Sequence, residues 1–186
     1  MPRRRPGRAA AAVLGLAVAL GSGAAAAAEP LELQVRAAFL YNFARLVNWP
    51  PGKLAGGDAP LQTCILEQDP VGPALLEAFT GKTIDGHPLA VRRLPDASGW
   101  EDCHIAYVGS AFPELTRDVL RGLAAHGVLT VHEDPSALPD GVIRLFLVER
   151  KLRFEVNQAA AERARLRLSS RLMALASVVQ VRSEHE

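Results

Sequence analysis

The sequence predicts an α/β fold: a single layered domain in which helices flank a mostly parallel sheet, with a late antiparallel hairpin. Three observations predict it. Short apolar runs alternate with helical segments along the chain, which is typical of parallel strands joined by crossover helices. Near the end, two strand-like runs are separated only by a short turn, which indicates a hairpin. The chain of 186 residues is long enough for one domain with a substantial core.

The first 28 residues have the composition of a secretory signal peptide. Four arginines lie among the first eight residues, an apolar stretch follows from Ala9 to Leu20, and Ala26–Ala28 offers a small-residue cleavage site before Glu29. The apolar stretch is short for a bilayer span, and no cysteine near the cleavage site would carry a lipid. We therefore expect residues 1–28 to be removed near Ala28 and the mature protein to be exported to the periplasm.

The charge of the mature chain narrows the classes of partner. Removal of the leader takes away four of the 21 Lys and Arg residues and none of the 20 Asp and Glu residues, which leaves a formal charge of −3. No long basic run remains, which argues against nucleic acid as a partner. No second long apolar run follows, so the mature chain is not expected to span a membrane. Residues 29–182 are expected to form the domain, and residues 183–186 a frayed tail.

The segment Val35–Pro50 predicts an amphipathic helix around which the core is organised. Its mostly apolar stripe recurs at three- and four-residue steps, through Val35, Phe39, Asn42, Phe43 and Leu46. Asn42 is the polar member of this stripe and needs a hydrogen-bond partner if it is buried. Trp49 precedes a proline, and that position disfavours helical backbone, so the helix is expected to stop there.

The later elements follow in chain order. The predicted strands are Leu61–Leu66, Leu89–Leu94, His104–Val108, Val128–Val131, Val142–Val148 and Leu152–Val156. The predicted helices are Gly72–Phe79, Pro113–Ala125, Gln158–Arg165 and a last one capped by Ser169, whose core face is Leu172, Leu175, Ala176 and Val179. The last two strands form the hairpin around Arg150–Lys151.

In the second arm of the hairpin, apolar and polar residues alternate. Such alternation is typical of a strand with one solvated face, and it places Arg153, Glu155 and Asn157 on that face. Asn157 also suits the cap of the next helix. The candidate contact residues for a partner or ligand are Tyr41, Asn42, Trp49, Arg153, Glu155, Asn157 and Arg171.

Cys64 and Cys103 are the two cysteines of the chain. In an oxidising compartment two cysteines usually pair, and neighbouring strands would hold these two close together. The alternatives are a free, redox-responsive pair, or a thiol or metal enzyme that also uses His87 and His104. The sequence has no CxxC and no HxxxH spacing, which disfavours a metal site. It also has neither G-x-S-x-G nor a Gly-rich phosphate loop, so we predict no catalytic residue and no cofactor.

Several motifs, in this order, resemble the YfiR-like family of small periplasmic bacterial proteins. They are AAFLYNFARLVNWP (37–50), Cys64, Cys103-His104, VLTVHED (128–134), GVIRLFLVERKLRFEVN (141–157) and LRLSSRLMALASVV (166–179). Two positions depart from the family pattern, since Asp140 and Ala164 stand where glycines are usual. The second, late disulfide of some members is also missing, which puts a two-disulfide redox switch in doubt.

The resemblance implies a non-enzymatic regulator. Such a protein represses an inner-membrane diguanylate cyclase by contact with its periplasmic sensor domain, which lowers cyclic-di-GMP and biofilm formation. The resemblance also implies an OmpA-like outer-membrane lipoprotein that sequesters the repressor, and a structural bridge between Cys64 and Cys103. The sequence also leaves open whether the protein forms a homodimer. An alternative function is a periplasmic small-molecule sensor, with Tyr41, Trp49 and Trp100 lining an apolar pocket.

Overall fold

The computed structural model describes residues 28–54, 56–137 and 139–179. Residues 1–27 of the predicted signal peptide and all of the predicted frayed tail lie outside this range, so both stay predictions. Within the described residues, no helix is long and apolar enough to cross a membrane.

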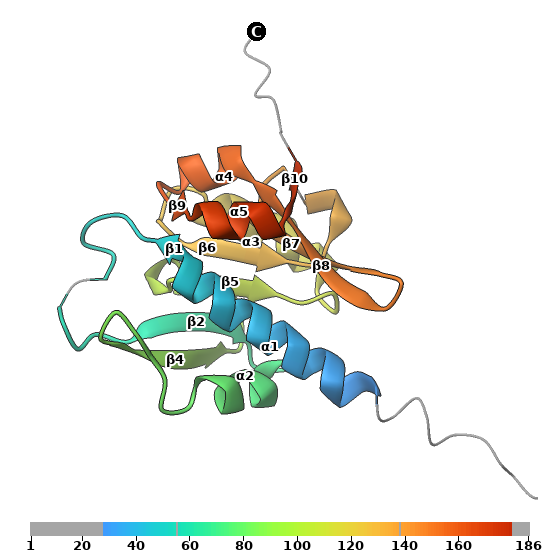
Figure 1. Cartoon of the computed structure of the whole chain (residues 1–186), viewed down its shortest axis with the longest axis horizontal. Coiled ribbons are helices and arrows are strands. Elements are labelled where there is room, and N and C mark those ends of the chain that lie inside the picture. Colours follow the sequence, from blue (N-terminus) through green and yellow to red (C-terminus); the bar gives the residue numbers. More distant parts are fainter. Residues whose placement is uncertain (1–27, 55, 138, 180–186) are drawn as a thin grey trace, which may run out of the picture.

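A sheet forms the middle layer of the domain. Its central strands are parallel neighbours, namely β4 (His87–Leu94), β2 (Leu61–Leu66), β5 (Ile105–Val108), β6 (Leu129–His132) and β7 (Ile143–Val148). Antiparallel pairing adds β8 (Lys151–Asn157) beside β7 and the short β3 (Thr83–Ile84) beside β4, and β10 (Ser177–Val179) pairs parallel with β8. The spatial order among the described strands is β10-β8-β7-β6-β5-β2-β4-β3 (Figure 1). The predicted mostly parallel sheet with a late hairpin is confirmed.

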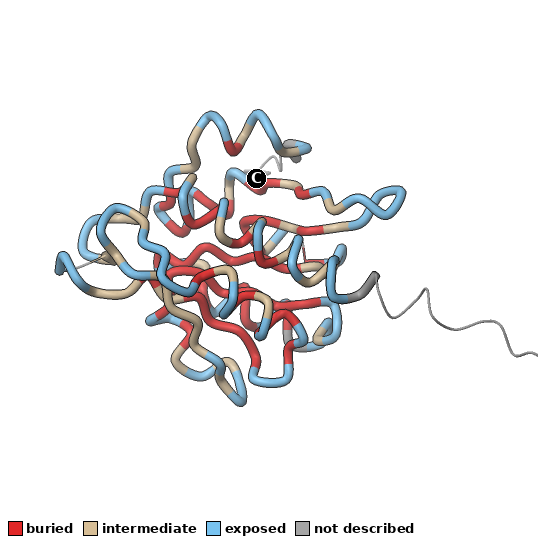
Figure 2. The backbone as a smooth tube through the Cα atoms, turned by 60° about the horizontal axis from the view of Figure 1, so that its bottom comes forward, coloured by how far each residue is buried: buried red, intermediate tan, exposed pale blue. Residues whose placement is uncertain are grey.

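Helices cover both faces of the sheet. On one face lie α1 (Ala28–Leu46), α2 (Gly72–Phe79), α4 (Gln158–Arg163) and α5 (Ser170–Leu175), and on the other lie α3 (Pro113–Leu123) and the 3-10 helix η1 (Trp100–Asp102). Strand β5 shows the division, because Ile105 and Tyr107 join the larger core cluster while Ala106 and Val108 join the smaller one. In Figure 2 the buried backbone runs through the central strands, and the loops around them are exposed.

Helix α1 ends three residues earlier than the proline signal predicts. It stops at Leu46 because Val47 and Asn48 form a short strand, β1, paired antiparallel with β9 (Arg167–Leu168). The Leu46 carbonyl, which has no partner within the helix, accepts a hydrogen bond from the Ser169 amide at 2.9 Å. The helix also begins before Val35, at Ala28.

The turn of the late hairpin lies one residue before its predicted position. Lys151 pairs with Val148 at the end of the ladder, so the turn residues are Glu149 and Arg150. Both have positive φ values, 48° and 63°. Two such residues in succession match the twist of a tight two-residue hairpin turn.

Two predictions about side chains near the chain's end are wrong. Asn157 is not on a solvated face but fully buried, because the start of α4 and the Pro139 carbonyl cover it. Leu175 is not a core residue but 66% exposed, because α5 ends there and the chain turns into β10. The predicted cap at Ser169 is confirmed, since its hydroxyl accepts from the Leu172 amide at 3.2 Å.

Candidate functional site

A groove of about 840 Å³ lies between α1, β8 and α5. Its lining comes from these elements, the hairpin and the start of β10: Val35, Ala38, Phe39, Asn42, Phe43, Arg45, Leu46, Phe146, Val148, Leu152, Arg153, Phe154, Arg171, Leu172, Leu175, Ala176 and Ser177. The volume lies within the range of small-molecule sites. The stripe that the sequence assigned to the core, from Val35 to Leu46, therefore faces this groove. Its member Phe43 is also part of the fully buried face of α1, together with Ala37, Leu40 and Ala44.

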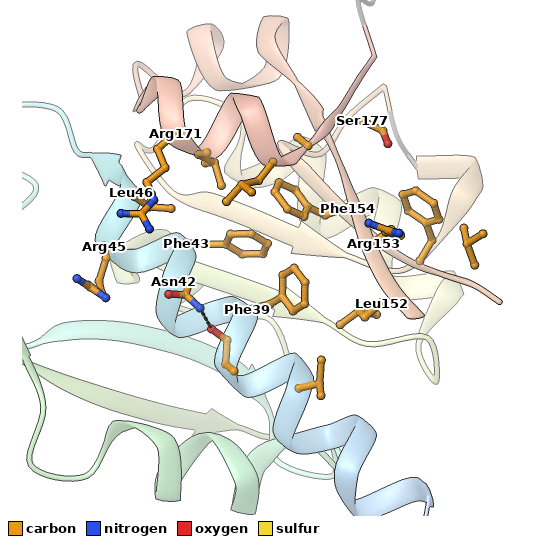
Figure 3. Close-up of a pocket in the computed structure, with 17 residues that line it drawn as sticks. Phe39, Asn42, Phe43, Arg45, Leu46, Leu152, Arg153, Phe154, Arg171 and Ser177 are labelled. Carbon is orange, nitrogen blue, oxygen red and sulfur yellow. Dashed lines mark hydrogen bonds between the residues drawn. The ribbon is translucent and has the colours of Figure 1, made fainter. Parts of the chain in front are cut away.

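Three aromatic rings meet at the floor of the groove. Phe154 on β8 has its ring centre 5.0 Å from that of Phe43 and 5.8 Å from that of Phe39, both on α1. Phe39 and Phe43 are themselves 5.8 Å apart, one helical turn along α1. Figure 3 shows all three rings in the space between the helix and the strand. Their edge-to-face and tilted arrangements are the favourable ones for aromatic pairs.

Three arginines surround this apolar floor. Arg45 comes from α1, Arg153 from β8 and Arg171 from α5, and in Figure 3 they lie toward the ends of the groove. None of the lining residues is acidic, and none of the three arginines forms an ion pair with another described residue. The groove therefore suits an occupant with apolar groups for the floor and negative charge for the rim.

One wall of the groove is an open strand edge. Strand β10 pairs with β8 only from Glu155 to Asn157, so residues 151–154 of β8 have no strand neighbour on that side among the described residues. On its other side, β8 is paired with β7 from Lys151 to Val156. An unpaired edge of this kind can accept an extended peptide as an added strand.

The structure brings three of the seven predicted contact residues to the groove. Asn42, Arg153 and Arg171 line it. Asn42 is exposed, and its amide donates to the Ala38 carbonyl one turn back at 2.9 Å. Because Asn42 is exposed, its side chain does not need a hydrogen-bond partner in the protein interior.

The other four predicted contact residues serve the fold elsewhere. Tyr41 packs against Phe79 of α2, with the Lys82 ammonium 4.4 Å from the centre of its ring. The Trp49 indole donates to the His104 carbonyl at 3.2 Å. Glu155 pairs with Arg144 at 2.9 Å, and Asn157 caps α4 by accepting from the Ala160 amide at 3.0 Å.

The sequence reasoning missed part of the groove. Phe146, Phe154 and Leu175 were assigned to a strand interior or to a helix core, yet they line the groove. The sequence feature that could have indicated the groove is the high density of large apolar residues in the hairpin and the last helix. Trp100, proposed for a ligand pocket together with Tyr41 and Trp49, is fully buried in the core cluster under α3, and none of these three residues lines the groove.

The two cysteines form a disulfide in the smaller core cluster. Cys64 on β2 and Cys103, just before β5, have Cα atoms 6.0 Å apart and are both fully buried. The neighbouring His104 uses both ring nitrogens, since Nδ1 accepts from the Gln62 amide and Nε2 donates to the Lys53 carbonyl, each at 3.0 Å. Burial lowers the pKa of His104, which favours this neutral form. His87, also proposed for such a site, has its Nδ1 2.8 Å from the Ala59 carbonyl oxygen. Cys64, Cys103 and His104 therefore make structural contacts within the fold.

A comparison with models of protein families identifies the family of the chain. A family model described as YfiR/HmsC-like matches residues 33–177. A comparison with curated protein sequences finds no significant match. Among solved structures, the chain is similar to a conserved domain protein from Vibrio cholerae O1 biovar El Tor, with 9% identity and a TM-score of 0.48. That match covers 80% of this chain and 60% of the Vibrio protein.

Proposed function

The chain belongs to the YfiR/HmsC-like family of periplasmic regulators of cyclic-di-GMP signalling, and on that premise we propose that it represses a membrane diguanylate cyclase by protein–protein contact. The contact surface is the groove between α1, β8 and α5, and its occupant is a segment of the cyclase's periplasmic sensor domain. Repression lowers cyclic-di-GMP and biofilm formation. The protein acts without a cofactor.

The observation that carries this proposal is the combination of an apolar floor with an acid-free, arginine-lined rim. Leu175, which lines the groove, is 66% exposed, and Val148, from the hairpin side of the lining, is also exposed. Burial of such side chains by a partner stabilises a complex by removing apolar area from water. The arginines steer and orient an acidic segment, and the open edge of β8 can pair with its backbone.

Repression then follows from selective binding. A partner shifts a conformational equilibrium only by binding one state more tightly than the other. We propose that the groove binds the inactive conformation of the sensor domain. An OmpA-like outer-membrane lipoprotein that relieves repression would compete for the same groove, because one surface cannot hold both partners.

A pair of matched variants tests this proposal. Leu175→Asp places a carboxylate at the groove rim, while Leu76→Asp places one on α2, at a leucine that is 44% exposed and lies outside the groove. Both variants are expected to unfold near the wild-type temperature, because both leucines are exposed side chains. In cells that lack the native gene, Leu175→Asp should leave cyclic-di-GMP at the deletion level, and Leu76→Asp should restore the low level.

Two results would count against the proposal. Unchanged cyclic-di-GMP on deletion of the gene under several growth conditions would remove the regulatory role. Full repression by Leu175→Asp would leave the role in place but move the contact surface away from the groove. Direct binding of the purified sensor domain to the two variants separates these outcomes from an effect on protein abundance.

The size of the groove supports a second candidate, a small-molecule sensor. A volume of about 840 Å³ holds a ligand of ordinary size, and the lining suits an amphiphile with one anionic group. A thermal-shift screen of fatty acids and aromatic carboxylates against the exported protein tests this candidate. Saturable stabilisation that is lost in Leu175→Asp supports it, and no shift with any compound argues against it.

A further inference from the structure

A second concave site lies next to α1, at the point in the sheet where successive strands are added first on one side of β2 and then on the other. From β2 the chain passes through α2 to β4 on one side, and then returns to place β5 on the opposite side of β2. In parallel sheets the crevice outside the carboxyl ends of two such strands is the usual position of a ligand. The segments that follow β2 and β5, at Asp69-Pro70 and Gly109–Ala111, both line a crevice of about 160 Å³ here.

The charged side chains of this crevice come from α1 and from the segments after β2 and β6, and Tyr107 on β5 adds a hydroxyl. Arg36 on α1 donates to Glu133, which follows β6, with Nε 2.7 Å from Oε1. Arg36 also reaches Glu32, one turn back on α1, at 3.4 Å. Tyr107 on β5 donates its hydroxyl to the same Glu133 Oε1 at 2.5 Å. These bonds fix the Glu133 carboxylate between a cation and a hydroxyl donor.

Asp69 is the group that these contacts do not satisfy. It is 3% exposed, and its Oδ1 accepts from the Val71 amide at 2.9 Å, but its Oδ2 makes no hydrogen bond of acceptable geometry. Burial raises the pKa of Asp69, and the amides of Val71 and Gly109 act in the opposite direction. The Gly109 amide thus acts on the carboxylate, but Oδ2 has no hydrogen bond that meets the usual limits of distance and angle.

Gly109 keeps this part of the crevice clear of a side chain. A Cβ atom at Gly109 would lie 2.7 Å from Asp69 Oδ2 and 3.4 Å from the Tyr107 hydroxyl. The first of these distances is too short for a carbon–oxygen contact, so no larger residue fits there without movement. The unused oxygen and the tyrosine hydroxyl therefore face the same small region.

The charges in the crevice do not balance. Glu32, Asp69 and Glu133 carry carboxylates, whereas Arg36 is the one cation among the lining residues. Both glutamates already pair with that cation, and Asp69 forms no ion pair with another described residue. A buried carboxylate without a cation or a full set of donors is costly, so the site favours a ligand that brings both positive charge and N–H groups.

We propose that this crevice binds a small organic ammonium compound, whose N–H groups donate to Asp69 Oδ2 with Glu133 nearby. The volume fits a compound of a few heavy atoms. Asp69 Oδ2 is covered in the structure, so entry of the ligand requires the groups around it to move. The crevice and the groove share no lining residue, so this site does not depend on the proposed function.

The test titrates the isotope-labelled exported protein with three small probes while amide resonances are recorded. Ethanolamine supplies the ammonium group, ethylene glycol is its neutral counterpart, and glycolate its anionic one. We expect saturable shifts at Gly109 and Ser110 with ethanolamine, and no saturable shift with the other two. Asp69→Asn should raise the dissociation constant about tenfold or more, the effect of losing one charge-assisted hydrogen bond.

Asp96→Asn is the matched control. Asp96 Oδ1 accepts from the Ser98 amide two residues later, as Asp69 does from Val71, but Asp96 is outside the crevice. Its substitution should leave ethanolamine binding unchanged. If Asp69→Asn fails to fold, the comparison of the three probes on the wild-type protein still tests the proposal. No saturable ethanolamine shift, or equal shifts with ethylene glycol, would overturn the proposal.

Discussion

The ring of Phe43 on α1 lies 5.0 Å from the ring of Phe154 on β8, inclined at 64°, and this pair joins the first helix to the late hairpin. Phe43 is 1% exposed, and Phe154 is also buried. The same two side chains thus belong to the core on one side and to the groove floor on the other. Their substitution should affect both stability and binding.

Replacement of Phe43 by alanine should lower the free energy of unfolding by about 3–4 kcal/mol. The loss combines the transfer of a buried ring with the cavity that remains. Phe43→Leu, which keeps most of the volume, should cost about 1 kcal/mol. Urea unfolding followed by circular dichroism measures both. A loss below about 1 kcal/mol for the alanine variant would show that the site collapses around the missing ring.

Loss of the disulfide should destabilise the protein by about 4 kcal/mol on the chain-entropy model. The bridge joins residues 39 positions apart in the sequence. The double variant Cys64→Ala/Cys103→Ala avoids an unpaired buried thiol and should unfold at a lower urea concentration than the wild type. Dithiothreitol should lower the wild-type midpoint toward that of the variant and leave the variant unchanged. A variant as stable as the wild type would mean that packing alone holds β2 and β5 together.

Removal of one partner from the buried ion pair should cost far more than removal from an exposed one. Arg36 and Glu133 are 12% and 9% exposed, whereas Arg121 and Asp140 are 61% and 25% exposed. Glu133→Gln leaves the Arg36 charge without its main partner and should cost about 3 kcal/mol. Asp140→Asn should cost at most about 1 kcal/mol. Equal costs in chemical denaturation would contradict this ranking.

Stability should fall as the pH is lowered from 6.5 to 4. His132 is fully buried, and burial lowers its pKa to about 4, from 6.5 in an unfolded chain. Between these values the unfolded state binds a proton that the folded state does not, so the loss begins near pH 6.5 and reaches about 3 kcal/mol by pH 4. The lowered pKa of His104 adds a loss of the same sign, and the raised pKa of Asp69 opposes it.

The variant His132→Asn isolates this effect, because asparagine does not titrate. Its unfolding midpoint should be lower than that of the wild type at pH 7 but should change less between pH 6.5 and pH 4. Thermal unfolding across this range provides the measurement. Parallel pH profiles for the two proteins would assign the acid sensitivity to other groups.

Reversal of charge at the groove rim should slow association with the proposed sensor domain. Arg171→Glu removes one rim cation and adds an acid, so the association rate at low salt should fall about tenfold. The difference from the wild type should shrink in 0.5 M salt, where exposed charges are screened. Arg117→Glu on α3 is the control, because Arg117 lies outside the groove. An equal effect of both variants would indicate a response to net charge rather than to the groove.

Local patterns predicted most of the elements but not their ends. Leu61–Leu66 and Gly72–Phe79 match the structure at both ends, because turn residues bracket each segment. The end of α1 was missed because Val47 pairs with Leu168, a contact between distant parts of the chain that no local window contains. For Asn157 the predicted cap of the next helix is confirmed, but its place on a solvated face was wrong, because alternation along a strand carries no information about what covers the last position.

The groove was predictable only in part. The stripe of α1 was found from its spacing, but spacing does not distinguish a face packed in the core from one that lines an open groove. That distinction depends on α5 and β8, which reach α1 only in the folded chain. Arg153 and Arg171 were identified as polar contact residues, and the structure places them at one groove together with Arg45, which had no distinguishing pattern of its own.

The pairing of Val47 with Leu168 also constrains how the protein folds. This contact joins the end of the first helix to a strand near the far end of the described chain, and the Ser169 amide bonds to the Leu46 carbonyl beside it. A chain that emerges from its N-terminus cannot close this contact until nearly all of it has been made. Contacts of such long range slow folding. The pairing of β1 with β9 should therefore form late, after the units of the central sheet that are closer together in the sequence.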